Sequence, residues 1–191
     1  MKNLLSKKCE TYYFDTINDF SGQELNDCII KYMTKADINN RTPVILCIGT
    51  DRATGDCLGP LVGEEMVNFS SRYRVFGTLQ SPVHALNIRE AINHINTYIK
   101  NPFIIAVDAS LGDSSHIGCV TVSNCPILPG KGVNKKLPAI GDISITGIVN
   151  TSGGSPGLLH STRLYTVMQL ACHISDALKY SISYLEDFCP L

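Results

Sequence analysis

Two aspartates lie where apolar, strand-like segments of the sequence end. Asp56 closes the short polar loop 50–56, which follows the apolar run 44–48, and Asp108 comes directly after the apolar run 103–107. Continuous apolar runs of this length are typical of strands that are covered on both faces. If the two strands are neighbours in a parallel sheet, their carboxyl ends meet at one edge, where open α/β sheets bind ligands.

The chemistry expected of this pair is acid–base catalysis. Two carboxylates held close together cannot both ionise easily, so one pKa rises and the pair can act as proton donor and acceptor. The same two oxygen ligands could instead bind a divalent metal ion. Either arrangement can activate water for attack on a carbonyl. We therefore predict Asp56 and Asp108 as the catalytic residues. The acid pair itself requires no cofactor, and a divalent metal at these two residues is the alternative.

Simpler interpretations of the same residues exist. Asp56 precedes a helix with Pro60 in its first turn, so it could be an N-cap that stabilises the helix by about 0.5–2 kcal/mol. Asp108 could cap a turn, and Asp51 fits a turn better than a catalytic role. Four histidines show no metal-ligand spacing: His84, His116, His160 and His173.

The periodicity of the chain predicts an α/β protein. Helical apolar spacing is found after a capping box at Ser21 and Glu24, and again in residues 57–69, 84–99 and 164–178. Further strands are expected at 74–79, 119–122 and 143–149, whereas residues 11–15 fit either a strand or an ordered arm. The alternation predicts a three-layer α/β/α sandwich with a mainly parallel sheet. We expect a single domain over 1–191, in which 1–40 is an extension that carries one helix.

The composition and charge of the chain argue against several classes of protein. The 191 residues are 44% hydrophobic, and 16 Lys and Arg balance 17 Asp and Glu, which argues against a nucleic-acid-binding or membrane-binding surface. The start of the chain lacks the pattern of a signal peptide, so we expect a cytoplasmic protein. Eight scattered cysteines without a C-x-x-C motif predict free or buried thiols and no structural zinc site.

Three motifs together resemble a known family. They read CIGTDRATGDCLGP at 47–60, IIAVDA at 104–109 and PGKGVNKK at 129–136. Over residues 42–178 the chain is similar to the YyaC family of sporulation proteins, which is related to the spore germination protease and more distantly to the hydrogenase maturation endopeptidases. The resemblance implies a three-layer α/β/α fold, a peptidase-type site and a location in the cytoplasm of the forespore or mother cell of a spore-forming bacterium.

The resemblance also bears on the acid pair. In the germination protease two aspartates in the matching motifs are the candidate catalytic pair, which corresponds to Asp56 and Asp108 here. In the hydrogenase endopeptidases a glutamate, an aspartate and a histidine bind nickel. This chain has Asp56 in place of the glutamate, and the region that would hold the histidine reads IVNTSGG at 148–154. The departure argues against nickel recognition and leaves the pair without a third ligand.

These observations predict a sporulation-associated endopeptidase. Backbone N–H groups around Gly49–Thr50 and 152–154 are expected to stabilise the oxyanion. The predicted substrate-binding residues are Gly49, Thr50, Asp51, Ser110, Lys131, Ser152, Gly153 and Gly154. The expected partner is a protein or peptide, and the resemblance implies small acid-soluble spore proteins. Two alternatives stay open, a non-catalytic binding or regulatory protein and a metal-dependent amide hydrolase, as does assembly into a homo-oligomer.

Overall fold

A computed structural model describes residues 8–17, 22–36, 38–69, 72–129, 138–152, 157 and 159–188. The strands are β1 Thr11–Asp15, β2 Thr42–Cys47, β3 Arg74–Phe76, β4 Pro102–Gly112, β5 Cys119–Ser123 and β6 Ile143–Thr151. The α-helices are α1 Gln23–Lys35, α2 Leu58–Met66, α3 Ile88–Tyr98 and α4 Leu164–Phe188. Short 3₁₀ helices span Ile38–Asn40, Thr54–Cys57 and Ser114–His116.

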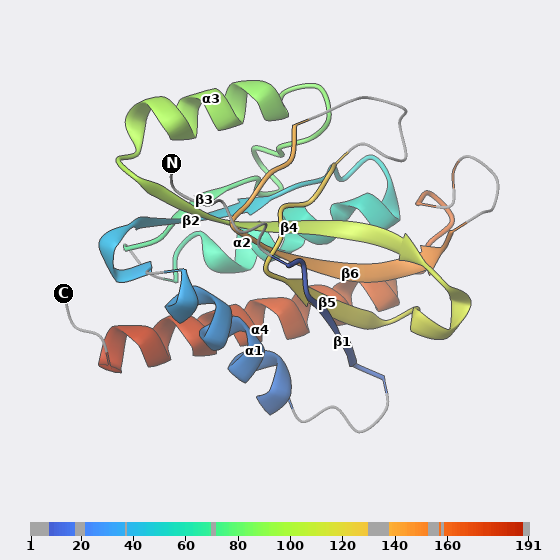
Figure 1. The fold of residues 1–191 in the computed structure, drawn as a ribbon. Coiled ribbons are helices and arrows are strands. Elements are labelled where there is room, and N and C mark those ends of the chain that lie inside the picture. The colour runs from blue at the N-terminus through green and yellow to red at the C-terminus, as the bar shows by residue number, and fades with distance from the viewer. Residues whose placement is uncertain are drawn as a thin grey trace.

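The strands form one mixed sheet between two helical layers (Figure 1). Its order is β1-β5-β6-β4-β2-β3, in which β3, β2, β4 and β6 are parallel and β5 is antiparallel to both of its neighbours, β6 and β1. Helix α3 lies on one face, and α1, α2 and α4 lie on the other. The predicted three-layer sandwich with a mainly parallel sheet is confirmed.

Apolar residues on the two faces form two separate cores. The larger core lies under α1, α2 and α4, and the apolar stripe of α4 runs along it through Val167, Leu170, Ile174, Leu178 and Ile182. The smaller core lies between α3 and the middle of the sheet and contains Val44, Leu46, Ile88, Ile95 and Ala106. Alternation along the central strands therefore places successive apolar side chains in different cores.

Strand β4 is longer than the sequence predicted. Pairing with β2 ends at Cys47 and Val107, where the prediction ended the strand, but pairing with β6 continues to Gly112. Asp108 therefore lies inside a strand and not at its tip. The apolar run records only the part of β4 that is covered on both faces, which is why the sequence pattern stopped too early.

Other boundaries differ by a few residues. The predicted helix 84–99 begins at Ile88, because a turn holds the preceding residues: the Asn87 side chain accepts from the His84 N–H at 2.8 Å, and the His84 carbonyl accepts from Ile88 N–H at 2.9 Å. The predicted strand 74–79 ends at Phe76. Residues 11–15, left open by the sequence, form an edge strand. Ser21 of the predicted capping box lies outside the described residues.

One cysteine pair contradicts the prediction of free thiols. Cys9 and Cys125 form a disulfide with their Cα atoms 5.6 Å apart, although 116 residues separate them in sequence. Cys9 precedes β1 and Cys125 follows β5, and the antiparallel pairing of these strands brings the two cysteines together. Sequence spacing could not reveal this pairing. Five cysteines are free among the described residues: Cys28, Cys47, Cys57, Cys119 and Cys172.

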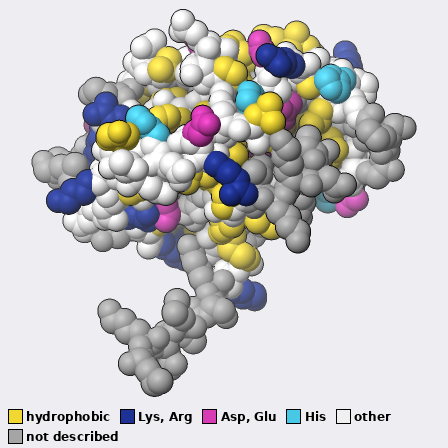
Figure 2. Space-filling model, turned by 90° about the horizontal axis from the view of Figure 1, so that it is seen from above, with side chains coloured by type: hydrophobic (Ala, Val, Ile, Leu, Met, Phe, Trp, Pro, Cys, Tyr) yellow, Lys and Arg dark blue, Asp and Glu magenta, His cyan; other side chains and the backbone are white. Residues whose placement is uncertain are grey.

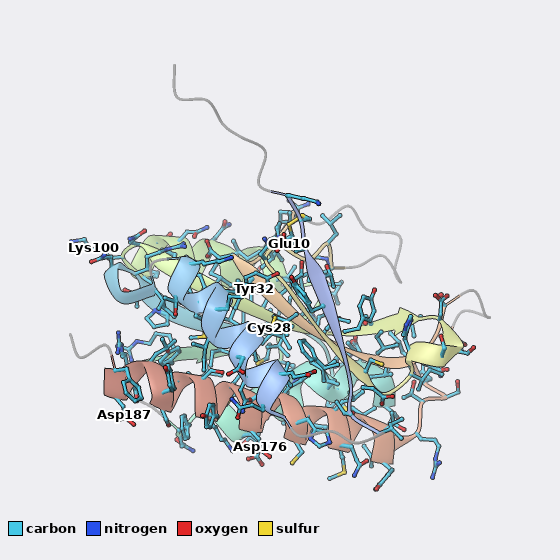
Figure 3. All side chains as sticks on the ribbon, turned by 60° about the horizontal axis from the view of Figure 1, so that its bottom comes forward. Glu10, Cys28, Tyr32, Lys100, Asp176 and Asp187 are labelled. Atoms are coloured by element: carbon cyan, nitrogen blue, oxygen red, sulfur yellow. A yellow bond between two sulfur atoms is a disulfide. The ribbon has the colours of Figure 1, made fainter. Side chains whose placement is uncertain are left out.

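Helix α1 packs beside the β1 end of the sheet. Figure 3 shows Cys28 and Tyr32 on α1 and Glu10 just before β1, and the Tyr32 hydroxyl donates to Glu10 Oε2 at 3.5 Å. Burial is the main cause that raises the pKa of Tyr32 to about 12 and that of Cys28 to about 11. Both side chains stay neutral at physiological pH, which suits a packing role.

The outer surface carries mixed charge. Figure 2 looks down on the α3 side, where basic and acidic side chains are interspersed without a large patch of one sign. Within the described part of the chain, none of the helices combines the length and the apolar character needed to cross a membrane.

Candidate functional site

The loop after β2 positions Asp56. This residue lies in the 3₁₀ helix Thr54–Cys57, and the N-cap of α2 is the next residue, Cys57, which makes no side-chain capping bond. The Asp56 backbone carbonyl accepts from the Thr50 N–H at 3.0 Å, which closes the loop. The structure therefore gives no support to the alternative that Asp56 serves as the cap of α2.

Two glycines allow this loop to fold tightly over the strand end. Gly49 has a φ of +143°, and a Cβ there would lie 1.9 Å from the Asp56 carbonyl oxygen. A Cβ on Gly59 would lie 2.1 Å from the Ile48 carbonyl oxygen. Only glycine permits such close backbone approach. These positions hold the acidic loop and the start of α2 against β2.

Strand β4 brings Asp108 beside this loop. The Ile48 N–H donates to the Val107 carbonyl at 2.7 Å, so Asp108 is next to the point where β2 turns into the loop. Asp108 Oδ1 accepts from the Ala109 N–H at 2.8 Å, which fixes the orientation of the carboxyl group. Strands β2 and β4 are neighbours, as predicted.

The electrostatics of the two carboxyl groups are coupled. Burial raises the pKa of Asp108 well above its ordinary value, and the nearby Asp56 raises it further. Burial also raises the pKa of Asp56, while the Thr50 N–H and the charges of His84 and His160 act in the opposite direction. Asp108 is thus the more strongly shifted member of the pair. Environments that push two carboxyl pKa values apart are typical of acid–base sites.

His84 and His160 are the neighbours that sequence reasoning missed. His84 follows Val83, which forms a parallel bridge with Ile48, and His160 lies in the turn before α4. Neither histidine has a sequence spacing to Asp56 that would indicate a site. Across the described ranges, no group of three or more His, Cys, Asp and Glu residues is arranged to hold a metal ion.

Three of the predicted oxyanion donors are already hydrogen-bonded within the fold. The Gly49 N–H donates to Val83 O at 2.8 Å, the Thr50 N–H donates to Asp56 O, and the Ser152 N–H donates to Gly112 O at 2.7 Å. These three N–H groups are therefore engaged in holding the fold, and those of Gly153 and Gly154 lie outside the described residues. The sequence could not show which backbone partners they have.

The remaining predicted substrate-binding residues divide into two groups. Asp51 is exposed on the loop, and Ser110 and Ser152 line a cavity. Three others lie outside the described residues: Lys131, Gly153 and Gly154. For the residues that are described, the prediction of a binding role stays a prediction.

The cavity lies at the carboxyl ends of β4 and β6 and has a volume of about 360 Å³. It is lined by Tyr13, Ser110, Leu111, Gly112, Asp113, His116, Thr121, Thr146, Ile148 and Ser152. Most of these residues were not predicted. The sequence did contain a signal for two of them. Thr121 in CVTVS and Thr146 in ISITGIV are polar residues within otherwise apolar strand segments.

Fold and site together define a three-layer α/β/α protein with paired, partly buried carboxyl groups beside the carboxyl edge of parallel strands. The chain belongs to the family described as "Protein of unknown function (DUF1256)", whose family model matches residues 15–177. It is 48% identical over 137 residues to "Uncharacterized protein YyaC" of Bacillus subtilis (strain 168), and the alignment covers 71% of this chain and 67% of that protein. The family resemblance found in the motifs is confirmed.

A solved structure is also similar. It is the [NiFe] hydrogenase maturation protease HycI from Thermococcus kodakarensis KOD1, with a TM-score of 0.46 and 16% sequence identity over 79% of this chain and 98% of that chain.

Proposed function

We propose that this protein is an endopeptidase-type hydrolase in which Asp56 and Asp108 act together on a peptide bond. The observation that carries the proposal is the electrostatic coupling of two carboxyl groups that are 52 residues apart in sequence and meet beside the carboxyl edge of the sheet. If the two acids had only a structural role, they would lower the stability of the fold at neutral pH without any functional benefit, because like charges at short range are unfavourable.

The two residues take different roles. Asp108 keeps its proton to higher pH than Asp56, so it donates a hydrogen bond and then a proton to the substrate. Asp56, with His84 and His160 near it, is the carboxylate that accepts a proton from the attacking water. The water oxygen bonds to the carbonyl carbon, the C–N bond breaks, and the amine leaves with a proton from the acid pair.

The substrate class follows from the family resemblance and from the cavity beside the site. The motif similarity to the germination protease implies small acid-soluble spore proteins or another sporulation protein as the polypeptide. The cavity of about 360 Å³ is at the small end of ligand sites, and it has room for a short stretch of chain.

The test is cleavage of purified small acid-soluble spore proteins, followed by intact-mass spectrometry from acid to neutral pH. Wild-type protein is expected to give defined fragments, and the Asp56→Asn/Asp108→Asn double variant to give none. Asp187→Asn is the control, because it removes an exposed carboxylate on α4, outside the predicted site, and is expected to leave cleavage unchanged. Loss of cleavage in the control, or persistent cleavage by the double variant, contradicts the proposal.

The two alternatives give different results in the same experiment. A metal-dependent amide hydrolase loses activity after EDTA treatment and regains it with a divalent metal, whereas the acid pair does not respond to EDTA. A binding or regulatory protein gives no fragments at any pH and retains its binding in the double variant.

A further inference from the structure

A row of polar side chains crosses the sheet beside the acid pair. Tyr13 on β1 pairs in register with Thr121 on β5, Thr121 pairs with Thr146 on β6, and Thr146 pairs with Asp108 on β4. Directly paired residues point to the same face of a sheet, so the four side chains line up across four strands. The row therefore leads from the edge of the sheet to the proposed catalytic residue.

Hydrogen bonds link the middle of this row. Thr121 Oγ1 and Thr146 Oγ1 are 2.7 Å apart, Thr146 Oγ1 and Ser110 Oγ are 3.2 Å apart, and Ser110 Oγ donates to the Gly147 carbonyl at 3.4 Å. Ser110 is two residues after Asp108 and shares its face of β4. The Tyr13 ring contacts the His116 ring, with centroids 5.0 Å apart.

The linked hydroxyls have more acceptors than donors. Each hydroxyl carries one hydrogen and two lone pairs. The arrangement that satisfies the three contacts above uses every hydrogen of Ser110, Thr121 and Thr146 and leaves most lone pairs unused. Asp113 adds a carboxylate to the cavity lining, and no Lys or Arg is among the described lining residues. An incoming group that donates hydrogen bonds fits the hydroxyl row and the Asp113 carboxylate better than an anion does, while His116 and the hydroxyls of Tyr13 and Ser152 are the donors of the lining.

We propose that this cavity is a specificity subsite that takes a hydrogen-bond-donating side chain of the polypeptide substrate next to the scissile bond. A carboxamide (Asn or Gln) or a cationic side chain (Lys or Arg) supplies the N–H groups that the hydroxyl row and Asp113 accept. An aliphatic side chain would leave the free lone pairs of the hydroxyls without a donor, and an acidic one would be repelled by Asp113. The inference rests on the proposed function for its placement beside the scissile bond, but the binding preference stands independently.

The test measures binding of blocked pentapeptides Gly-Gly-X-Gly-Gly, with X as Gln, Lys, Leu or Glu, by ¹H–¹⁵N NMR titration of the whole chain. We expect Gln or Lys peptides to bind roughly 2- to 10-fold more tightly than Leu and Glu peptides. The shifts should appear at Ser110, Thr121 and Thr146. The comparison of Gln with Lys identifies whether the donor is neutral or cationic.

Two variants make the test specific. Thr146→Val keeps the shape of the side chain and removes its hydroxyl. The affinity for the Gln and Lys peptides is therefore expected to fall to about that for the Leu peptide. Thr11→Val, on the exposed start of β1 and outside the cavity lining, is the control and should keep the preference. Equal binding of all four peptides, tighter binding of Leu or Glu, or an unchanged preference in Thr146→Val would overturn the subsite.

The result is separable from the proposed function. If peptides with donor side chains bind more tightly but no polypeptide is cleaved, the subsite is supported and the peptidase function is contradicted. Cleavage that shows no preference for donor side chains supports the peptidase and removes the subsite.

Discussion

The two faces of β4 differ in what covers them. On one face, Phe103, Ile105 and Val107 pack into the large core under α1, α2 and α4. On the other, Ile104 and Ala106 pack toward α3, and the next residues on that face are Asp108 and Ser110. The change from apolar to polar occurs on one face only, where the α3 core ends.

This difference explains where the site lies. The face of β4 toward α1, α2 and α4 stays apolar to the end of the strand, while the face toward α3 carries carboxyl and hydroxyl groups beyond the α3 core. Residues that must act on a substrate are held best by rigid elements. The large core thus holds the strand that carries Asp108.

The largest expected effect concerns Asp108, on the polar end of the α3-side face of β4. Asp108→Asn removes the acid of the pair, so cleavage of a spore-protein substrate should fall by about 10²- to 10⁴-fold. Wild-type activity should rise with pH as Asp56 ionises and fall again as Asp108 loses its proton, and the residual activity of the variant should lack the second limb. Steady-state rates across pH measure the loss of cleavage and the shape of the pH profile. A variant with the wild-type pH profile would contradict the role of Asp108 as the acid.

A pair of substitutions on β4 compares the two faces directly. Ile105→Ala leaves a cavity in the large core and should lower the free energy of unfolding by about 2–5 kcal/mol. Ser110→Ala on the α3-side face removes the hydroxyl contacts to Thr146 and Gly147 and should cost about 1 kcal/mol or less. Urea unfolding measures both values. Equal losses would mean that the two faces contribute alike.

The Cys9–Cys125 disulfide fastens the edge strand β1 to β5. Cys9→Ser/Cys125→Ser should lower the free energy of unfolding by about 2–4 kcal/mol, because the bond closes a long loop of the unfolded chain. Thermal unfolding without reductant measures the loss, and the difference should vanish in a reducing buffer. Cys172→Ser, at an exposed free thiol, is the control. A wild-type melting temperature in the double variant would show that the edge does not need the bond.

The raised pKa of Asp108 predicts how stability depends on pH. The unfolded chain releases this proton near the ordinary pKa of 3.8, and the folded chain does so at higher pH. The stability associated with the protonated carboxyl is therefore complete below the ordinary pKa and is lost as pH rises through the raised one. Asp108→Asn cannot ionise, so it should be more stable than wild type at neutral pH, with a difference that shrinks toward acid pH. Chemical unfolding at several pH values checks this, and a variant less stable than wild type at neutral pH would refute it.

The smallest expected effect lies in the helical layer that contains α4. Ser181 on α4 is fully buried, and its hydroxyl has no partner among the described residues. Ser181→Ala should raise the free energy of unfolding by up to about 1 kcal/mol, because an unsatisfied buried hydroxyl is removed. The control Ser175→Ala breaks a bond to the Ala171 carbonyl at 2.7 Å and should give no gain. Calorimetry of both variants tests the difference, and destabilisation by Ser181→Ala would point to a partner for its hydroxyl.

The sequence predicted the elements better than their ends. Helix α4 and the strands β5 and β6 follow from periodicity, because an apolar stripe shows directly in the sequence where a helix or strand is buried. The additional length of β4 and the late start of α3 did not follow from periodicity. The first depends on pairing with a distant strand, and the second on the hydrogen bonds of Asn87 to a local turn.

The candidate site shows the same division. Asp56 and Asp108 could be named from the sequence because each stands where an apolar run meets polar residues. His84, His160 and the row from Tyr13 to Thr146 could not, because their proximity depends on the order of strands in the sheet. The sequence also could not show that the N–H groups of Gly49 and Ser152 are already bonded, since their acceptors lie on other segments.

The sequence by itself determined the α/β class, the buried faces of the main helices and the two aspartates, since burial and local turns leave a pattern within short stretches of chain. Only the tertiary structure decided the strand order, the Cys9–Cys125 bond, the coupled carboxyl groups and the cavity beside them. Each of these depends on residues far apart in the chain becoming neighbours, and that information is not contained in any local pattern.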